Sequence, residues 1–397
     1  MTTSGQTRWP CAIVLVISAV LGVPHEARSQ SVADVLTFLV TNQSVETGSV
    51  ERDRDAAQAT SDTISRALRA NLATLPVTTS SGAFVYRLNP ELGTVERATS
   101  SYGPFFVERA LTAGPHQASI GLTFQHLRFT SLDGANLRDG SLVTTANQFV
   151  DERTAFDVDA LTLAIDADIA TLYGNFGVSK QMEIGFAAPM IALRLDGSRR
   201  NTYRGRVFTQ ATAHATAVGL ADMVVRTKYT LLNEDGAALA TAVDLRLPTG
   251  REEDLLGAGS AALKFAAIGS LERGRTSAHA NAGLSVGGLA RELDYGGALA
   301  IAATNRVTIS GEVLGRWLDS FGHIARVTAP HPRLIGVETI RLIPDSSTLH
   351  IMTLVPGLKW NVGDTWVLAA NVSIPLTTGG LTSRFTPFVG LDYAFGR

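Results

Sequence analysis

Two alternating segments, residues 223–231 and 239–247, constrain the fold of this chain most. In both, mostly apolar side chains at odd-numbered positions alternate with small, polar or charged ones. The charged side chains of the second face are Arg226, Lys228, Asp244 and Arg246. Asn233-Glu234-Asp235-Gly236 joins the segments. Because successive side chains of a strand point to opposite faces, and Asp-Gly suits a tight turn, the pattern predicts a β-hairpin with one apolar and one charged face.

Two environments suit such a hairpin. In a soluble β-sandwich the apolar face is buried and the charged face meets water. In a transmembrane barrel the apolar face meets lipid and the charged face lines the lumen. How often the pattern recurs along the chain distinguishes the two.

The pattern recurs about twelve times after residue 116. The predicted strands lie near residues 116–129, 157–178, 182–196, 218–232, 237–249, 260–272, 275–288, 296–303, 306–319, 348–361, 365–377 and 384–395. Short turns are expected at 179–180, 233–236, 273–274, 304–305 and 363–364, and longer loops at 130–156, 197–217, 250–259, 289–295, 320–347 and 378–383. Alternating short and long connections are typical of an up-and-down antiparallel transmembrane β-barrel whose short turns face the periplasm. The predicted fold class is therefore all-β.

Within two runs the alternation changes phase, near Gln125 and near Leu193. Because an extra residue restores the phase of a strand, we expect a β-bulge at each place. Aromatic residues gather near strand ends, which is typical of the girdles at membrane interfaces. The expected interface aromatics are Tyr229, Trp317, Trp360, Trp366, Tyr393 and Phe395.

The N-terminal part differs from the rest. Residues 1–30 combine Arg8, an apolar run and a small-x-small site at Ala27-Arg28-Ser29, which predicts a secretory signal peptide. The one cysteine, Cys11, lies in this segment, so we expect neither disulfides nor thiolate metal sites after it. Residues 31–115 have helical periodicity and then many turns, and we expect a partly helical plug or periplasmic segment. Residues 116–397 would form the barrel.

Short motifs in the second half of the chain resemble a known family. They are Gly219-x-x-Asp222, Lys228-Tyr229, Leu247-Pro248-Thr249-Gly250, Leu256-Gly257-x-Gly259 and His279-x-Asn281-x-Gly283. In this order they resemble the outer-membrane family named MetA-pathway of phenol degradation, over roughly residues 170–397. The resemblance implies a transporter-like, porin-like barrel of Gram-negative bacteria that passes aromatic and other hydrophobic compounds.

The candidate permeation residues are polar side chains on the faces expected to line the lumen. They are Asp222, Arg226, Lys228, Asp244, Arg246, Lys264, His279, Asn281, Glu312, Arg316 and Asp392. Arg226 is expected opposite or diagonal to Asp244. The alternative is that these charges only stabilise one another. Gly257-Ala258-Gly259 lacks the strand and helix of a dinucleotide site and is interpreted as a flexible loop. Asp166 and Asp168 share a face, as a calcium site or as a plain polar wall.

The leading hypothesis is an outer-membrane channel for passive uptake of small hydrophobic or aromatic compounds. We expect no enzyme activity, no cofactor and no metal. The alternatives are a structural or adhesive barrel, and a barrel acyl hydrolase built on His279 with Ser277, Asn281 and Ser285. Expected partners are outer-membrane lipid and small hydrophobic ligands. A net charge of −2 excludes a nucleic-acid-binding surface, and the oligomeric state is left open.

Overall fold

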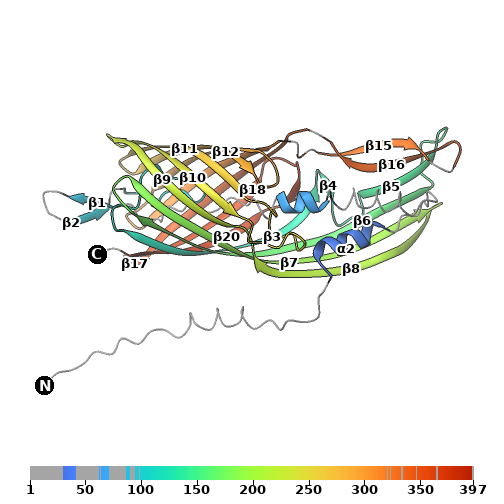
Figure 1. Ribbon diagram of the computed structural model, residues 1–397, viewed down its shortest axis with the longest axis horizontal. Coiled ribbons are helices and arrows are strands. Elements are labelled where there is room, and N and C mark those ends of the chain that lie inside the picture. The colour runs from blue at the N-terminus through green and yellow to red at the C-terminus, as the bar shows by residue number, and fades with distance from the viewer. Residues whose placement is uncertain are drawn as a thin grey trace, which may run out of the picture. The chain divides into compact units, whose positions relative to one another are not determined.

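Twelve antiparallel strands close into a barrel in the computed structural model (Figure 1), which confirms the predicted fold class. The structure describes residues 30–41, 62, 64–70, 86–89, 94–97, 99–319, 321, 323–331, 334–345, 347–363 and 365–395. The predicted signal peptide therefore lies outside the described residues, Gln30 apart. The barrel strands are β3 (Ala118–Leu132), β6 (Asp157–Gly177), β7 (Met182–Tyr203), β9 (Met223–Glu234), β10 (Ala237–Leu247), β11 (Ala262–Arg273), β12 (Thr276–Gly287), β13 (Glu292–Ala302), β14 (Val307–Leu318), β17 (Leu349–Gly363), β18 (Trp366–Pro375) and β20 (Thr386–Phe395). Pairing of β20 with β3 closes the ring.

The hairpin of β9 and β10 forms as predicted. Asp235 and Gly236 have φ angles of 48° and 80°, the positive values that a two-residue hairpin turn needs. The register places Asp244 directly opposite Arg226. Val225 and Leu245 point outward and are exposed, whereas Lys228 is fully buried inside. The barrel therefore has the apolar exterior and charged interior that the alternation predicts.

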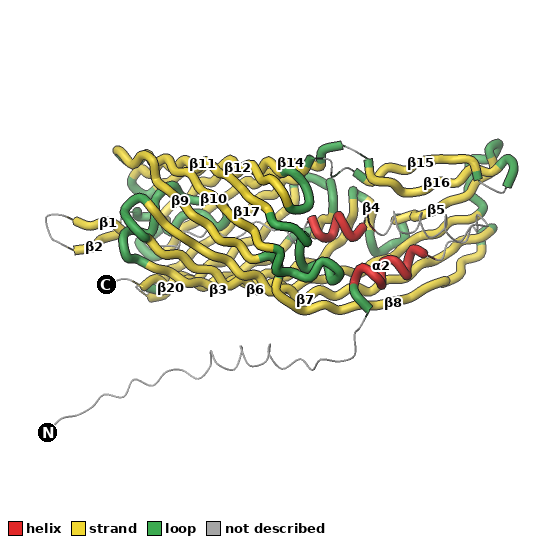
Figure 2. The backbone as a smooth tube through the Cα atoms, viewed as in Figure 1, coloured by secondary structure: helices red, strands yellow, loops and turns green. Residues whose placement is uncertain are grey.

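Several of the predicted long loops are strands, and there the prediction was wrong. These strands are β4 (Ala135–Asn136), β5 (Leu142–Phe149), β8 (Arg206–Leu220), β15 (Ile324–Pro330), β16 (Val337–Pro344) and β19 (Leu381–Ser383). β16 pairs with β5, β5 with β6, and β8 with β7. Figure 2 shows this part of the wall running on from the barrel at the end opposite the short turns. We call β5, β8, β15, β16 and the adjoining halves of β3, β6 and β7 the extension. β1 (Tyr86–Asn89) and β2 (Thr94–Arg97) form a separate two-stranded sheet.

The predicted bulges near Gln125 and Leu193 are absent, and the polarity of the wall reverses instead. β3 keeps one register against β6 from Ala118 to Phe129, and β6 pairs residue by residue with β7 past Leu193. On β3 the outward side chains change from Leu122 and Phe124 to His126 and Arg128. The inward ones change from Ser119 and Thr123 to Leu127 and Phe129. The extension is thus polar outside and apolar inside, as in a water-soluble protein.

Two helical stretches fill the apolar inner face of the extension. Helix α2 (Val32–Thr41) begins with a capping box, in which the Ser31 and Asp34 side chains each accept the other residue's backbone N–H. Val32, Val35, Leu36 and Leu39 are buried against the sheet, as are Ile64 and Leu68 from residues 64–70. The predicted helical structure is confirmed at residues 32–41 and 64–70. The last predicted helical turn, with Leu72 and Leu75, lies outside the described residues. Among described residues, no helix has the length and apolarity of a membrane-spanning helix.

The docking of α2 can be tested on its own. Leu36 is fully buried and Phe38, on the opposite face, is 53% exposed. We expect Leu36→Ala to weaken docking by about 2–5 kcal/mol, because a cavity is left in a packed core. Amide hydrogen exchange in α2 should then become much faster. Phe38→Ala is the matched control, and equal acceleration in both variants would contradict the packing described here.

Candidate functional site

Residues 99–117, which we call the inner segment, contact lumen side chains from several strands. The Tyr102 N–H donates to Thr308 Oγ1 on β14 at 3.0 Å. The Ala110 N–H donates to Ser270 Oγ on β11 at 2.9 Å, and its carbonyl accepts from Thr230 Oγ1 on β9 at 2.6 Å. Because these strands lie on different parts of the ring, the inner segment crosses the lumen.

Glu312 anchors the middle of the inner segment. The residue lies on β14, is fully buried, and points inward as predicted. Its carboxylate accepts the backbone N–H groups of Phe105 at 2.5 Å and of Phe106 and Val107 at 2.9 Å. A buried carboxylate requires such compensation, since an unpaired buried charge is costly. Glu312 and the inner segment are therefore mutually dependent.

Two buried lysines bind carbonyl groups of the same segment. Lys228 Nζ donates to the carbonyls of Arg109 at 3.3 Å and Leu111 at 3.1 Å, and lies 3.2 Å from a Glu183 carboxylate oxygen. Lys359 Nζ, on β17, donates to the carbonyls of Tyr102 at 3.3 Å and Pro104 at 2.7 Å. Carboxylates thus bind the N–H groups of the segment and ammonium groups bind its carbonyls.

The predicted cross-strand pair of Arg226 and Asp244 is confirmed. Arg226 Nε and Nη2 donate to the two carboxylate oxygens of Asp244, each at 2.5 Å. Arg226 also pairs with Glu108 of the inner segment. Asn281, with its amide oriented to satisfy both polar atoms, accepts from the Glu108 N–H at 2.5 Å and donates to the Glu108 carbonyl at 3.2 Å. Glu108 thereby connects the segment to a third part of the wall.

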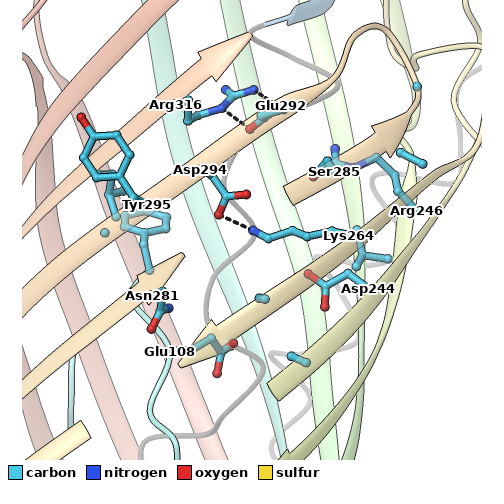
Figure 3. A pocket seen from close by; sticks show the side chains of 18 of the residues that line it. Glu108, Asp244, Arg246, Lys264, Asn281, Ser285, Glu292, Asp294, Tyr295 and Arg316 are labelled. Atoms are coloured by element: carbon cyan, nitrogen blue, oxygen red, sulfur yellow. Dashed lines mark hydrogen bonds and ion pairs between the residues drawn. The ribbon is translucent and has the colours of Figure 1, made fainter. Parts of the chain in front are cut away.

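A cavity of about 150 Å³ borders the inner segment at Phe106, Val107 and Glu108 (Figure 3). Its wall carries two further ion pairs, Lys264 with Asp294 at 2.6 Å and Arg316 with Glu292 at 2.6 and 2.9 Å. The half-buried Arg246 lines the same cavity. Positive and negative groups therefore alternate around this space.

A second cavity, of about 600 Å³, borders the inner segment near the short turns. Thr99, Leu111 and Thr112 line it together with Lys180 and Gly236, which belong to those turns. The inner segment thus contributes to the walls of two cavities that share none of its residues.

Of the side chains suggested for a hydrolase, Ser277 and Asn281 contact the inner segment, and His279 is linked to it through Ser270. His279 is 3% exposed, and its Nδ1 lies 2.9 Å from Ser270 Oγ, which is occupied by the Ala110 N–H. Ser277 Oγ lies 3.0 Å from Ser101 Oγ. Ser285 lines the smaller cavity, away from this pair. His279 itself lines neither of the two cavities, and its contact with Ser270 favours a supporting role.

Asp222 does not lie on the strand that was predicted to carry it, whereas Asp392 points inward on β20 as predicted. Asp222 lies in the break between β8 and β9 and accepts the N–H groups of Gly250 at 3.1 Å and Ala258 at 2.8 Å. A Cβ at Gly257 would lie 2.6 Å from the Asp222 carboxylate, so the glycine is needed for this close packing. The loop interpreted as flexible is therefore packed around a buried carboxylate. Asp392 accepts from the hydroxyl of Tyr173 inside the barrel.

Asp166 and Asp168 lie on the outer face of the extension. Asp166 pairs with Arg128 at 3.0 Å, and Asp168 pairs with Arg194 at 2.5 Å and contacts His126 at 2.7 Å. Within the described part of the chain, no three or more His, Cys, Asp and Glu side chains are grouped so as to hold a metal ion. Because both carboxylates are paired with arginines, we interpret the pair as part of a polar wall.

The predicted interface aromatics are all exposed or have exposed neighbours on the outer face. Tyr229, Trp360 and Trp366 lie near the short turns and are between 38% and 46% exposed. Tyr393 lies between Trp366, with tilted rings whose centroids are 4.6 Å apart, and Phe395, in an edge-to-face contact at 4.7 Å. Trp317 lies at the other end of the barrel, 4.8 Å from Tyr295. Their role as a membrane girdle stays a prediction.

Several site residues escaped the sequence analysis: Glu108, Glu183, Glu292, Asp294 and Lys359. Glu183 and Lys359 lie on predicted strands, on the same inward faces as other polar residues, so strict alternation would have found them. Glu292 and Asp294 lie where a loop was expected. No pattern marks Glu108, because its chain is irregular and only the surrounding barrel gives it partners.

Closed strand pairing, an apolar exterior and a charged interior together define an outer-membrane β-barrel, because lipid tolerates neither unpaired strand edges nor charge.

No family model and no curated protein matches the chain. Solved structures match its fold at low identity. One is an outer membrane channel from Pseudomonas putida F1, with 13% identity, a TM-score of 0.47, and 71% of this chain and 96% of that chain covered. Another is the toluene transporter TodX of P. putida, with 10% identity, a TM-score of 0.33, and 71% and 90% covered. The outer membrane protease OmpT of Escherichia coli also matches, with 11% identity, a TM-score of 0.26, and 72% and 98% covered.

Proposed function

We propose that the protein is an outer-membrane channel for small hydrophobic or aromatic compounds, with the inner segment as its plug. The observation that carries the proposal is the inner segment itself, which crosses the lumen between strands and is held there by hydrogen bonds and ion pairs. A lumen filled by wall side chains alone would need no such segment. When a plug moves, its polar groups can exchange hydrogen bonds to the wall for hydrogen bonds to water. Apolar side chains that become exposed have no such replacement, so exposing them costs free energy.

The apolar inner face of the extension supports a hydrophobic ligand class. Leu163, Ile165, Leu193 and Leu195 lie on strands above the charged lumen and face inward. Because α2 and residues 64–70 cover these side chains, an apolar molecule that has crossed the polysaccharide layer would meet them, before it meets the charges, where the helical stretches move aside. From there it would leave through the lumen or sideways into lipid. The motif resemblance to the MetA-pathway of phenol degradation family points to the same ligand class.

A structural or adhesive barrel is the main alternative, and an uptake experiment separates the two. Cells with and without the protein would receive N-phenyl-1-naphthylamine, an apolar probe that fluoresces in the inner leaflet. We expect a faster fluorescence rise in cells that contain the protein, because the probe would bypass the outer polysaccharide layer. Equal rates in both strains, at equal levels of other outer-membrane proteins, would favour the structural barrel.

A further inference from the structure

A row of charged side chains crosses the outer face of the extension just past the apolar band. On β3 the row begins where Phe124 gives way to His126, and on β7 where Ala192 gives way to Arg194. The strand registers align Arg128 with Asp166 and Asp166 with Arg194. The change in polarity marks the edge of the hydrocarbon layer, so this row lies at the level of the lipid head groups.

The three arginines of this row are more exposed than the carboxylates that they contact. Arg128, Arg194 and Arg138 have side chains that are 61%, 53% and 39% exposed, whereas Asp166 and Asp168 are 22% and 26% exposed. The carboxylates lie beneath the arginines and orient them. Arg128 uses its Nε on Asp166, so both of its Nη groups can donate to a ligand. Arg194 uses one Nη on Asp168.

We propose that Arg128, Arg138 and Arg194 bind the phosphate groups of the glycolipid of the outer leaflet. An oriented guanidinium presents several N–H donors in a plane and binds phosphate through two of them at once. Basic clusters at the level of the head groups are attracted to anionic lipid. The ligand class follows from the position of the row, because at this depth the anions available to an outward-facing side chain are those of the lipid itself.

The experiment uses the full-length barrel in detergent, freed of lipid, with purified lipopolysaccharide as the probe. Binding is measured for the unchanged protein, for Arg128→Gln/Arg194→Gln, and for the unchanged protein with dephosphorylated lipopolysaccharide. We expect the double variant and the dephosphorylated probe each to bind about tenfold more weakly or worse, since each loses charged hydrogen bonds. Arg128→Lys/Arg194→Lys keeps the charge without the planar donors, so its affinity for lipopolysaccharide should lie between those of the unchanged protein and the glutamine variant.

The matched control is Arg273→Gln/Arg275→Gln, which removes two exposed arginines at the short-turn end of the barrel. That variant should bind lipopolysaccharide like the unchanged protein. Heat-modifiable mobility on gels shows whether each barrel is folded, and the lysine variant supplies the comparison if the glutamine variant is not. The proposal is overturned if both glutamine variants lose the same affinity, or if removal of the phosphates has no effect.

Discussion

Replacing Glu312 by alanine is expected to release the inner segment and raise the conductance of the barrel. The variant leaves the N–H groups of Phe105, Phe106 and Val107 without their carboxylate acceptor, and it removes one of the negative charges near Lys359. Removing one partner of a buried charged network costs about 3–5 kcal/mol. Single-channel recordings in planar bilayers measure the conductance, and chymotrypsin cleavage at Phe105 and Phe106 measures release of the segment.

Ser310→Ala is the matched control for this variant. Ser310 precedes Glu312 by one inward position on β14 and is buried, and its Oγ has no hydrogen-bond partner in the described part of the chain. Its loss should change neither conductance nor cleavage. If Glu312→Ala conducts no more than Ser310→Ala while Phe105 stays protected, the inner segment is held by other contacts and is not a plug released at this point.

Leu172→Arg is expected to impair the barrel severely, whereas Ala164→Arg is expected to be tolerated. Both residues point outward on β6, eight positions apart. Leu172 lies opposite Leu122 in the apolar band, where an arginine costs about 2–4 kcal/mol at the centre of the membrane. Ala164 lies in the extension opposite Asp196, so an arginine there meets water and a carboxylate. Urea unfolding in lipid vesicles measures the two free energies.

Comparison of these two variants also tests the reversal of polarity. If Ala164→Arg destabilises the barrel as much as Leu172→Arg, the outer face of β6 is in lipid along its whole length. The extension would then not stand outside the membrane, and the lipid-binding row inferred from it would lose its basis.

The barrel was predictable because its strands obey one rule from end to end. The turn at Asp235-Gly236 joins β9 and β10, and a one-residue shift of register between Leu239 and Ala240 then brings Arg226 opposite Asp244. The extension was not predictable in this way, since its strands obey the same alternation with the two faces exchanged. At Gln125 an exchange of environment and a shift of phase produce the same sequence pattern, and only the hydrogen-bond register separates them.

The contacts of the inner segment were beyond prediction for another reason. Glu312 binds backbone N–H groups, which every residue except proline possesses, so the partner's sequence carries no complementary signal. The inward direction of Glu312 could be predicted, but not what the carboxylate meets. The charges proposed as permeation residues are therefore largely engaged with the segment or with one another, and their effect on permeation stays a prediction.

Strand β6 runs without a break from the extension into the membrane-spanning part of the barrel, and this continuity affects how strongly its register is fixed. In the barrel, odd-numbered side chains such as Asn175 face polar partners. In the extension, odd-numbered side chains such as Leu163 face the apolar core. A one-residue slip of the register would turn the leucines of the extension toward water. In the membrane-spanning part it would turn amide side chains toward the lipid acyl chains. Both halves of β6 therefore disfavour the same wrong registers, and no mispaired register of β6 is acceptable to one half alone.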